Sequence, residues 1–279
     1  MADWVQYLLA VSPPLLLVAV LVLTLPRSAH GLRIMILVLG FVLARDSMTR
    51  YGLWEFGTVE RSGGHGVVSE LPVLWLRFTD DPVALLVMAA ASLALAAGVL
   101  LACRDRLRTV MWVGPNWFVS VALGQVGAAV VVAPFVVLYG PLGEWFSPVN
   151  DALRSLTGAS VSVADRGGTV ALALLPVLLL FALCGNLVEE VLFRGFLQSH
   201  VEDELTGRGA RWRAVVVSAL AFGAAHLFLA FTVTGLGWPI VLFTLWEGLV
   251  CAVIALRHGV LGATVTHGIA IFLLASGLV

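Results

Sequence analysis

Seven stretches of the chain are apolar over about 20 residues, the length that a helix needs to cross the ~30 Å hydrocarbon core of a bilayer. They are Tyr7–Leu25, Val83–Cys103, Trp117–Tyr139, Val170–Phe193, Ala214–Phe231, Trp238–Leu256 and Val260–Leu278. An eighth stretch, Leu32–Ala44, is shorter and contains Arg33, so it spans if its ends snorkel to the headgroups. The sequence therefore predicts an all-α, polytopic membrane helix bundle with about eight transmembrane helices.

The composition supports a membrane protein and excludes other classes. Of the 279 residues, 60% are hydrophobic and 12% are charged, and the mean hydropathy is +1.02, whereas a soluble chain of this length carries far more charge. The net charge of -1 gives no reason to expect a nucleic-acid partner. The three cysteines lie in apolar runs and are expected to be small buried side chains. All 16 basic residues are arginine, which suggests a GC-rich prokaryotic genome and a place in the plasma or inner membrane.

The chain shows no separable soluble domain. Residues 1–168 are expected to form N-terminal helices with two long polar loops, Arg45–Asp81 and Gly140–Gly168, and residues 169–279 a helical core. The N-terminal run lacks a basic region and an obvious cleavage site, so we expect a retained helix. Arginines are most frequent in the short odd-numbered connections, which the positive-inside rule assigns to the cytoplasm. Both termini are then outside, and the Glu189-Glu190 pair lies near the cytoplasmic end of the fifth helix.

Two adjacent carboxylates, Glu189 and Glu190, close the apolar run that precedes Arg194. An isolated ionisable group at bilayer depth costs from ~2.5 to more than ~10 kcal/mol, so such residues are first candidates for function. Glu190 and Arg194 have the spacing and order of a helical ion pair, which keeps Glu190 ionised and makes it a poor general base. Glu189 is rotated about 100° away and has no cation at helical spacing, so it is the better candidate to take a proton from water. The alternative is that all three residues snorkel at the interface.

Further polar residues lie in the later apolar runs. His226 and His267 have small neighbours, which favour close helix packing; each alone would be a satisfied core histidine, but two beside buried carboxylates favour a site. Glu247 has no basic residue within a helical turn, so it serves the site or forms an interhelical hydrogen bond. Asn186, one turn before the glutamates, could orient a carboxylate, donate to an oxyanion, or join two helices.

The order of these motifs resembles the CPBP family of intramembrane proteases, which includes the CAAX-prenyl-endopeptidase-like and ABI proteins. The resemblance runs from about Val170 to Leu278 and rests on Glu189-Glu190-Val191-Leu192-Phe193-Arg194, on Phe222-x-x-x-His226, and on the turn Leu256–Leu261 that leads into His267. It implies a cavity within a helical bundle, open toward the cytoplasm, in which water attacks a peptide bond. By resemblance Glu189 is the activating base, Glu190 and Arg194 are the supporting pair, and His226 and His267 position the water or stabilise the oxyanion.

Two features bear on the mechanism. The chain lacks the His-Glu-x-x-His signature of zinc proteases, so no cofactor is expected; if zinc is used, its ligands are Glu189, His226 and His267. The family often has Asn or Asp four residues after the last histidine, where this chain has Ile271. We expect Asn186 or His226 to supply the missing oxyanion donor.

The expected partner is a peptide or a membrane-anchored protein substrate, together with the lipid bilayer. In a prokaryote a leader peptide or a C-terminal sorting tail is the favoured substrate. Two alternatives stay open: a non-catalytic relative that acts in self-immunity or membrane assembly, and a proton-coupled transporter that uses Glu189, Glu190 and Glu247 as a relay. The sequence is silent on oligomeric state.

Overall fold

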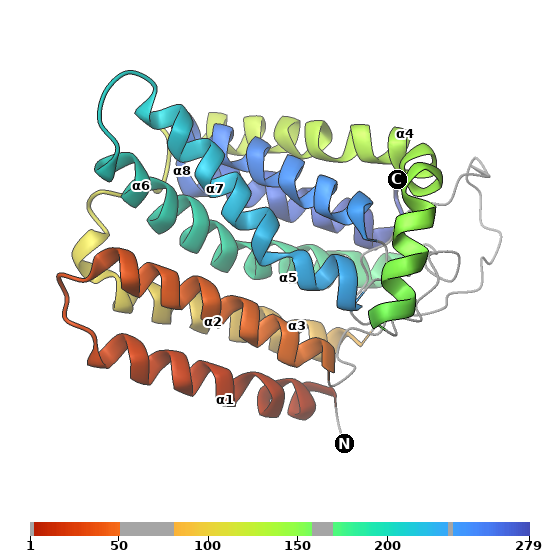
Figure 1. Cartoon of the computed structure of the whole chain (residues 1–279), viewed down its shortest axis with the longest axis horizontal. Coiled ribbons are helices and arrows are strands. Elements are labelled where there is room, and N and C mark those ends of the chain that lie inside the picture. The colour runs from red at the N-terminus through yellow and green to blue at the C-terminus, as the bar shows by residue number, and fades with distance from the viewer. Residues whose placement is uncertain (1–2, 51–80, 158–169, 234–236) are drawn as a thin grey trace.

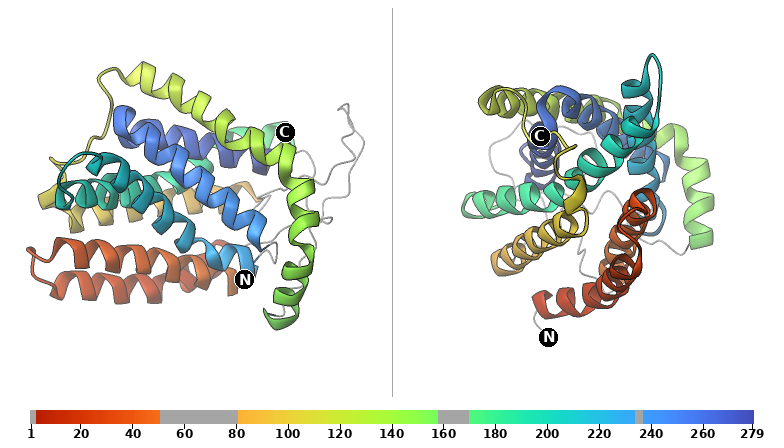
Figure 2. Two further views of the ribbon diagram at one scale, coloured as in Figure 1. Left: turned by 45° about the horizontal axis from the view of Figure 1, so that its top comes forward. Right: turned by 90° about the vertical axis from the view of Figure 1, so that its left-hand side faces the viewer.

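The computed structural model describes residues 3–50, 81–157, 170–233 and 237–279, and these residues form helices and turns without a strand. The main helices lie side by side along one direction (Figures 1 and 2). They are α1 (Asp3–Thr24), α2 (His30–Arg50), α3 (Pro82–Ala102), α4 (Trp117–Thr157), α5 (Leu175–Glu190), α6 (Ser199–Glu204), α7 (Ala210–Ala225) and α8 (Trp238–Ser276). Four shorter segments connect or extend these helices. Two are 3₁₀ turns, η1 (Arg104–Arg106) and η3 (Leu172–Leu174), and two are π-helical, η4 (Val191–Gln198) and η5 (Leu229–Val233).

Five helical segments of the described residues are long and apolar enough to cross a membrane: Pro82–Ala102, Trp117–Leu138, Leu172–Glu204, Ala210–Phe231 and Trp238–Ser276. Two shorter apolar helices, Val11–Thr24 and His30–Ala44, correspond to the stretches Tyr7–Leu25 and Leu32–Ala44 of the sequence. The described residues are therefore all-helical, and the chain is a multi-pass membrane protein. The count of about eight transmembrane helices is not confirmed and stays a prediction.

The last segment, α8, is a hairpin of two helical arms. Gly259 adopts φ +65° and ψ −167°, a conformation closed to most residues with a side chain. Twenty residues of straight helix would separate Glu247 from His267 by ~30 Å, yet Glu247 Oε2 lies 3.6 Å from His267 Nε2. The two arms match the separate stretches Trp238–Leu256 and Val260–Leu278 of the sequence, and Figure 1 shows the chain returning beside itself.

The hairpin turn is held by the segment that follows η1. The first amides of the second arm, those of Val260 and Leu261, donate to the carbonyls of Met111 (3.0 Å) and Trp112 (2.9 Å). These bonds satisfy backbone donors that a helix start leaves without partners. The same end of the bundle collects the connections α1–α2, α3–α4 and α6–α7 (Figure 1).

That end carries a concentration of arginine. Its connections and the neighbouring helix ends hold Arg27, Arg104, Arg106, Arg108, Arg208, Arg211, Arg213 and Arg257. Arg106 of the α3–α4 connection forms an ion pair with Asp203 of α6, and Arg211 Nε pairs with Glu202 Oε1 at 3.1 Å across the α6–α7 connection. The odd-numbered connections of the sequence thus meet at one end, as the orientation by the positive-inside rule requires.

Two expectations about helix ends are wrong. The fifth helix does not end at the glutamates, because η4 and α6 continue it, and Glu189 and Glu190 lie near the middle of the 33-residue segment Leu172–Glu204. The expected loop Gly140–Gly168 is helical as far as Thr157, where α4 ends after a bend (Figure 1). The remaining residues of that loop, and most of the Arg45–Asp81 loop, lie outside the described residues.

Candidate active site

Glu190 is a fully buried carboxylate at the end of α5, and one of its oxygens has two partners. Its Oε1 lies 3.0 Å from Arg194 Nη1 and 2.8 Å from His267 Nδ1. The ion pair expected from the four-residue spacing is therefore present, and both of its side chains are completely shielded from solvent. Arg194 also donates through Nη2 to the carbonyl of Gly248, at 3.0 Å. These contacts tie α5, η4 and both arms of α8 together.

Glu189 points to a different set of groups. Its Oε2 lies 3.4 Å from His226 Nε2 and 4.0 Å from His267 Nε2. The side chain is 3% exposed. The two neighbouring glutamates therefore occupy distinct environments: Glu190 faces a guanidinium and Glu189 faces two imidazoles.

His226 caps α7 and is oriented by its own helix. Its Nδ1 lies 2.8 Å from the carbonyl oxygen of Phe222, to which it can only donate. In a neutral imidazole this fixes the proton on Nδ1 and leaves Nε2, the nitrogen nearest Glu189, as an acceptor. His226 is thus set to accept a proton or a hydrogen bond at the point where Glu189 ends.

His267 lies on the second arm of α8, and a close helix contact brings it to α5. A Cβ at its neighbour Gly268 would lie 2.8 Å from Leu183 Cδ2 and 3.0 Å from Leu183 Cα, so only glycine allows this approach. Nδ1 of His267 donates to Glu190, and its Nε2 faces both Glu189 and Glu247. Glu247, 2% exposed, therefore belongs to the same cluster of side chains.

Aromatic rings enclose the cluster. The Arg194 guanidinium carbon lies 4.3 Å from the centre of the Phe222 ring, which packs against His226 (4.3 Å between centroids) and His267 (5.4 Å). Phe41 of α2 approaches the His226 ring to 6.0 Å. Sequence reasoning missed Phe41, because its helix is far from the motifs along the chain.

The helix widens to a π-helix directly after Glu190. In η4 the carbonyl of Phe193 accepts a hydrogen bond from Ser218 Oγ of α7 at 3.1 Å, and Gln198 Nε2 donates to the carbonyl of Ala252 at 3.1 Å. Single π-helical turns inside longer helices are frequent at functional sites. Here the widening ties the segment that carries Arg194 to α7 and α8.

Two other residues considered from the sequence lie beside the cluster. Asn186 Nδ2 donates to the carbonyl of Ala182 on its own helix, at 2.8 Å, so one amide hydrogen of Asn186 is used within α5. Ile271, one turn after His267, is 8% exposed and belongs to an apolar cluster with Phe181 and Leu274. The position where the family often has a polar side chain is therefore packed as core.

The interfacial alternative for the glutamates is wrong. Glu189, Glu190 and Arg194 are 3%, 0% and 4% exposed and lie in the interior of the bundle. Burial of an unpaired charged side chain costs free energy, and the contacts described above offset that cost.

The side chains that could hold a zinc ion are partly committed to other contacts. Ligand atoms bound to one zinc ion lie at about 2.0–2.3 Å from it; within the described ranges only Glu190, Cys251 and His267 bring their ligand atoms within 4.8 Å of one another. In that group the Glu190 oxygen is paired with Arg194, and His267 Nδ1 bonds the same oxygen. Of the expected zinc ligands, Glu189 Oε2 lies 3.4 Å from His226 Nε2 and 4.0 Å from His267 Nε2, but the three ligand atoms are not all within 4.8 Å of one another in the described residues.

Comparison with known proteins identifies the C-terminal part of the chain. Residues 171–273 match the family described as type II CAAX prenyl endopeptidase Rce1-like, which confirms the resemblance to the CPBP family over these residues. No curated protein and no solved structure matches. The matched residues include Glu189, Glu190, Arg194, His226, His267 and Glu247. At the level of the family, the match therefore supports the activity of a CAAX-type intramembrane protease.

Proposed function

We propose that this membrane protein, whose residues 171–273 are Rce1-like, is an intramembrane endopeptidase. It would hydrolyse a peptide bond with a water molecule activated by Glu189. The observation that carries the proposal is the division between the two carboxylates: Glu190 is held by Arg194 and His267, whereas Glu189 Oε2 faces His226 Nε2 at 3.4 Å. Neighbouring carboxylates in distinct environments take distinct roles in catalysis.

In the proposed reaction a water molecule lies between Glu189 and His226. Glu189 takes one proton as the water oxygen attacks the carbonyl carbon of the peptide, and His226 Nε2 accepts a hydrogen bond from the other proton. A tetrahedral intermediate forms. Its carbon–nitrogen bond breaks as Glu189 returns the proton to the leaving amine, which yields a carboxylic acid and an amine with every atom of water accounted for.

The developing oxyanion needs a hydrogen-bond donor. A His267 side chain that carries a proton on both nitrogens donates from Nδ1 to Glu190 and from Nε2 into the cluster. Glu247, next to that Nε2, is a supporting residue in the proposal, and Phe222 holds Arg194 and both imidazoles in place. No step passes through a metal ion.

A non-catalytic relative is the second candidate, and Ile271 is the observation in its favour. Its apolar packing removes a donor that the family often has, and loss of one such donor costs ~10²–10³ in rate. The proposal therefore depends on His267 taking over that function. The proton-coupled transporter has no observation of its own in its favour.

We propose as substrate a peptide segment held at the membrane, either a leader peptide or a C-terminal sorting tail. The site lies near the middle of a 33-residue helical segment, so the scissile bond must enter the bundle. The arginine-rich end of the bundle is assigned to the cytoplasm, and the membrane is that of a prokaryotic cell.

The test uses full-length protein in detergent or lipid nanodiscs with a panel of membrane-associated peptides. Glu189→Gln keeps the size of the side chain and should reduce cleavage by ~10²–10⁴-fold with an unchanged melting temperature. Glu204→Gln, which alters an exposed carboxylate on α6, is the matched control and should cleave normally. A Glu189→Gln protein that cleaves as fast as the wild type would refute the proposal.

A further inference from the structure

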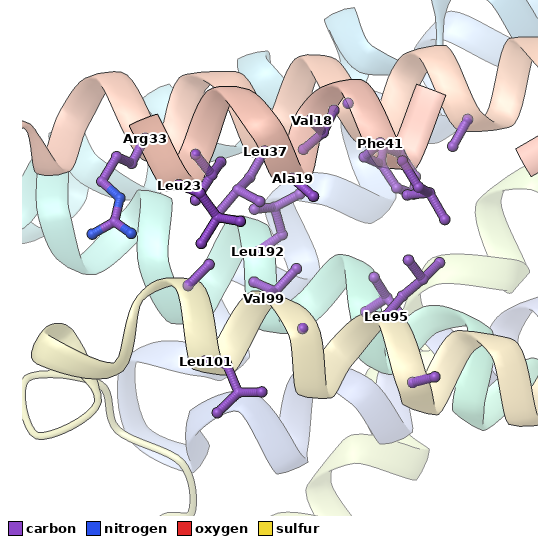
Figure 3. A pocket seen from close by; sticks show the side chains of 18 of the residues that line it. Val18, Ala19, Leu23, Arg33, Leu37, Phe41, Leu95, Val99, Leu101 and Leu192 are labelled. Carbon is purple, nitrogen blue, oxygen red and sulfur yellow. The ribbon is translucent and has the colours of Figure 1, made fainter. Parts of the chain in front are cut away.

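A second feature of the molecule is a cavity of about 650 Å³ between α1, α2 and α3, closed at its base by α5 and η4 (Figure 3). Its walls are mainly aliphatic side chains. None of Glu189, His226, His267 and Glu247 lines it, so it is separate from the carboxylate cluster. It lies largely outside residues 171–273, in the N-terminal part of the chain.

The cavity has the length of one bilayer leaflet. On α2 its lining runs from Arg33 to Ala44, which is about 16 Å at 1.5 Å per residue, and half of the hydrocarbon core is ~15 Å. Leu23 and Leu101 line it on opposite sides and are 82% and 72% exposed. The cavity thus opens sideways between α1 and α3, toward the acyl chains of a surrounding bilayer.

One end of the cavity is basic. Arg27, Arg33 and Arg104 line it there together with Asp105, whose carboxylate lies 2.8 Å from His30 Nδ1. None of the three arginines forms an ion pair within the described part of the chain. The other end, near Ala44, has no charged lining residue among those described. The cavity is therefore amphipathic along its length.

Arg33 is the distinctive group at this end. It is 8% exposed, and its Nε has no hydrogen-bond partner among the described residues. Figure 3 shows the guanidinium directed into the space between α2 and α3. A buried guanidinium without an anion is costly, and the surrounding charge, three arginines to one carboxylate already close to His30, favours an anionic ligand.

We propose that this cavity binds one acyl chain of an anionic phospholipid from the leaflet at the arginine-rich end, with the lipid phosphate on Arg33. A guanidinium binds phosphate oxygens in a bidentate manner, and basic pockets between transmembrane helices on the cytoplasmic side bind anionic headgroups. Arg27 and Arg104 flank the phosphate, and the acyl chain fills the apolar length. The bound lipid lies one side chain from the candidate active site, because Phe41 lines the cavity and packs against His226.

The test measures lipid binding, so it does not depend on peptidase activity. Full-length protein is stripped of lipid in neutral detergent and titrated with phosphatidylglycerol or phosphatidylcholine of identical acyl chains. Bound lipid is counted by native mass spectrometry, and the melting temperature is followed, since a ligand that binds only the folded state raises it. Both lipids carry the phosphate, but the choline cation of phosphatidylcholine is repelled by the three arginines, so the wild type should bind phosphatidylglycerol about tenfold more tightly.

Three variants separate the contributions. Arg33→Gln should abolish the preference for phosphatidylglycerol, whereas Arg108→Gln, an exposed arginine at the same end that does not line the cavity, should keep it. Gly98→Leu fills the cavity at a lining position where an added Cβ meets nothing within 4 Å, and it should weaken binding of both lipids. Equal affinity for both lipids in the wild type, or binding of phosphatidylglycerol unaffected by Gly98→Leu, would overturn the proposal even if Arg33→Gln failed to fold.

Discussion

Nδ1 of His267 lies 2.8 Å from Oε1 of Glu190, the same oxygen that Arg194 approaches to 3.0 Å. One carboxylate oxygen thus joins the end of α5, the π-helical segment and the second arm of α8. Because this carboxylate is committed to a cation and an imidazole, proton transfer in the proposed reaction falls to Glu189.

Breaking the Glu190–Arg194 pair should destabilise the fold. Arg194→Met leaves a buried carboxylate without its cation, which costs ~3–5 kcal/mol, and it should lower the melting temperature in detergent. The double variant Glu190→Gln/Arg194→Met removes both charges and should recover much of the loss, because the amide carbonyl that replaces the carboxylate can still accept from His267. An Arg194→Met protein with the melting temperature of the wild type would contradict the buried pair.

Truncation of His226 and truncation of Asn186 should have very different effects on the rate of cleavage. His226→Ala removes a ring that faces Glu189 and should reduce cleavage by ~10²–10³-fold. Asn186→Ala should leave the rate close to that of the wild type, because the Asn186 amide donates to Ala182 within its own helix. Steady-state cleavage of one peptide by both purified variants gives the comparison; the reverse order would make Asn186 the oxyanion donor.

Metal removal should leave cleavage unchanged. Among the described residues the ligand atoms of Glu189, His226 and His267 are not all within 4.8 Å of one another. In the group that meets this limit, Glu190, Cys251 and His267, the Glu190 oxygen is paired with Arg194. Wild-type protein dialysed against EDTA is compared with undialysed protein and with Glu189→Gln. Activity that disappears on dialysis and returns with zinc would replace the glutamate mechanism by a metal-dependent one.

Gly259→Ala should disrupt the α8 hairpin. An added Cβ would lie 2.8 Å from the carbonyl carbon of Trp112, and the backbone conformation itself costs ~1–3 kcal/mol for a residue with a side chain. Gly98→Ala is the matched control: it lies in a regular helix with open space around it, where alanine is favoured by up to ~1 kcal/mol. A Gly259→Ala protein as stable as the control would contradict the tight turn.

The sequence was sufficient for local relationships within one helix. The four-residue spacing of Glu190 and Arg194 predicted their ion pair, since helical geometry alone sets that distance. The apolar lengths likewise predicted a membrane helix bundle. The family resemblance placed His226 and His267 near Glu189, and the structure brings all three together; their catalytic roles stay predictions.

Relationships between helices were not predictable from spacing. The partner of Glu247 depends on the hairpin at Gly259, which no periodicity reveals. The apolar run before Arg194 was expected to stop near the glutamates, but their pairing with Arg194 and the two histidines lets the helix continue through them. Arg33 was expected to snorkel, whereas it is buried beside a cavity built from three helices. A hydropathy profile treats a charged residue as an interruption of an apolar run. It contains no information on the side chains that neutralise that charge in the fold.

The hairpin also sets the order in which the cluster can assemble. Glu247 and His267 are 20 residues apart and meet as soon as the two arms of α8 close, whereas the contact between Glu190 and His267 spans 77 residues and needs the closure of a far longer loop. During synthesis Glu190 therefore has Arg194 as its early partner, and the imidazole arrives only with the second arm of α8. A nascent chain that has not reached residue 267 holds its two glutamates without the histidine that joins them to Glu247.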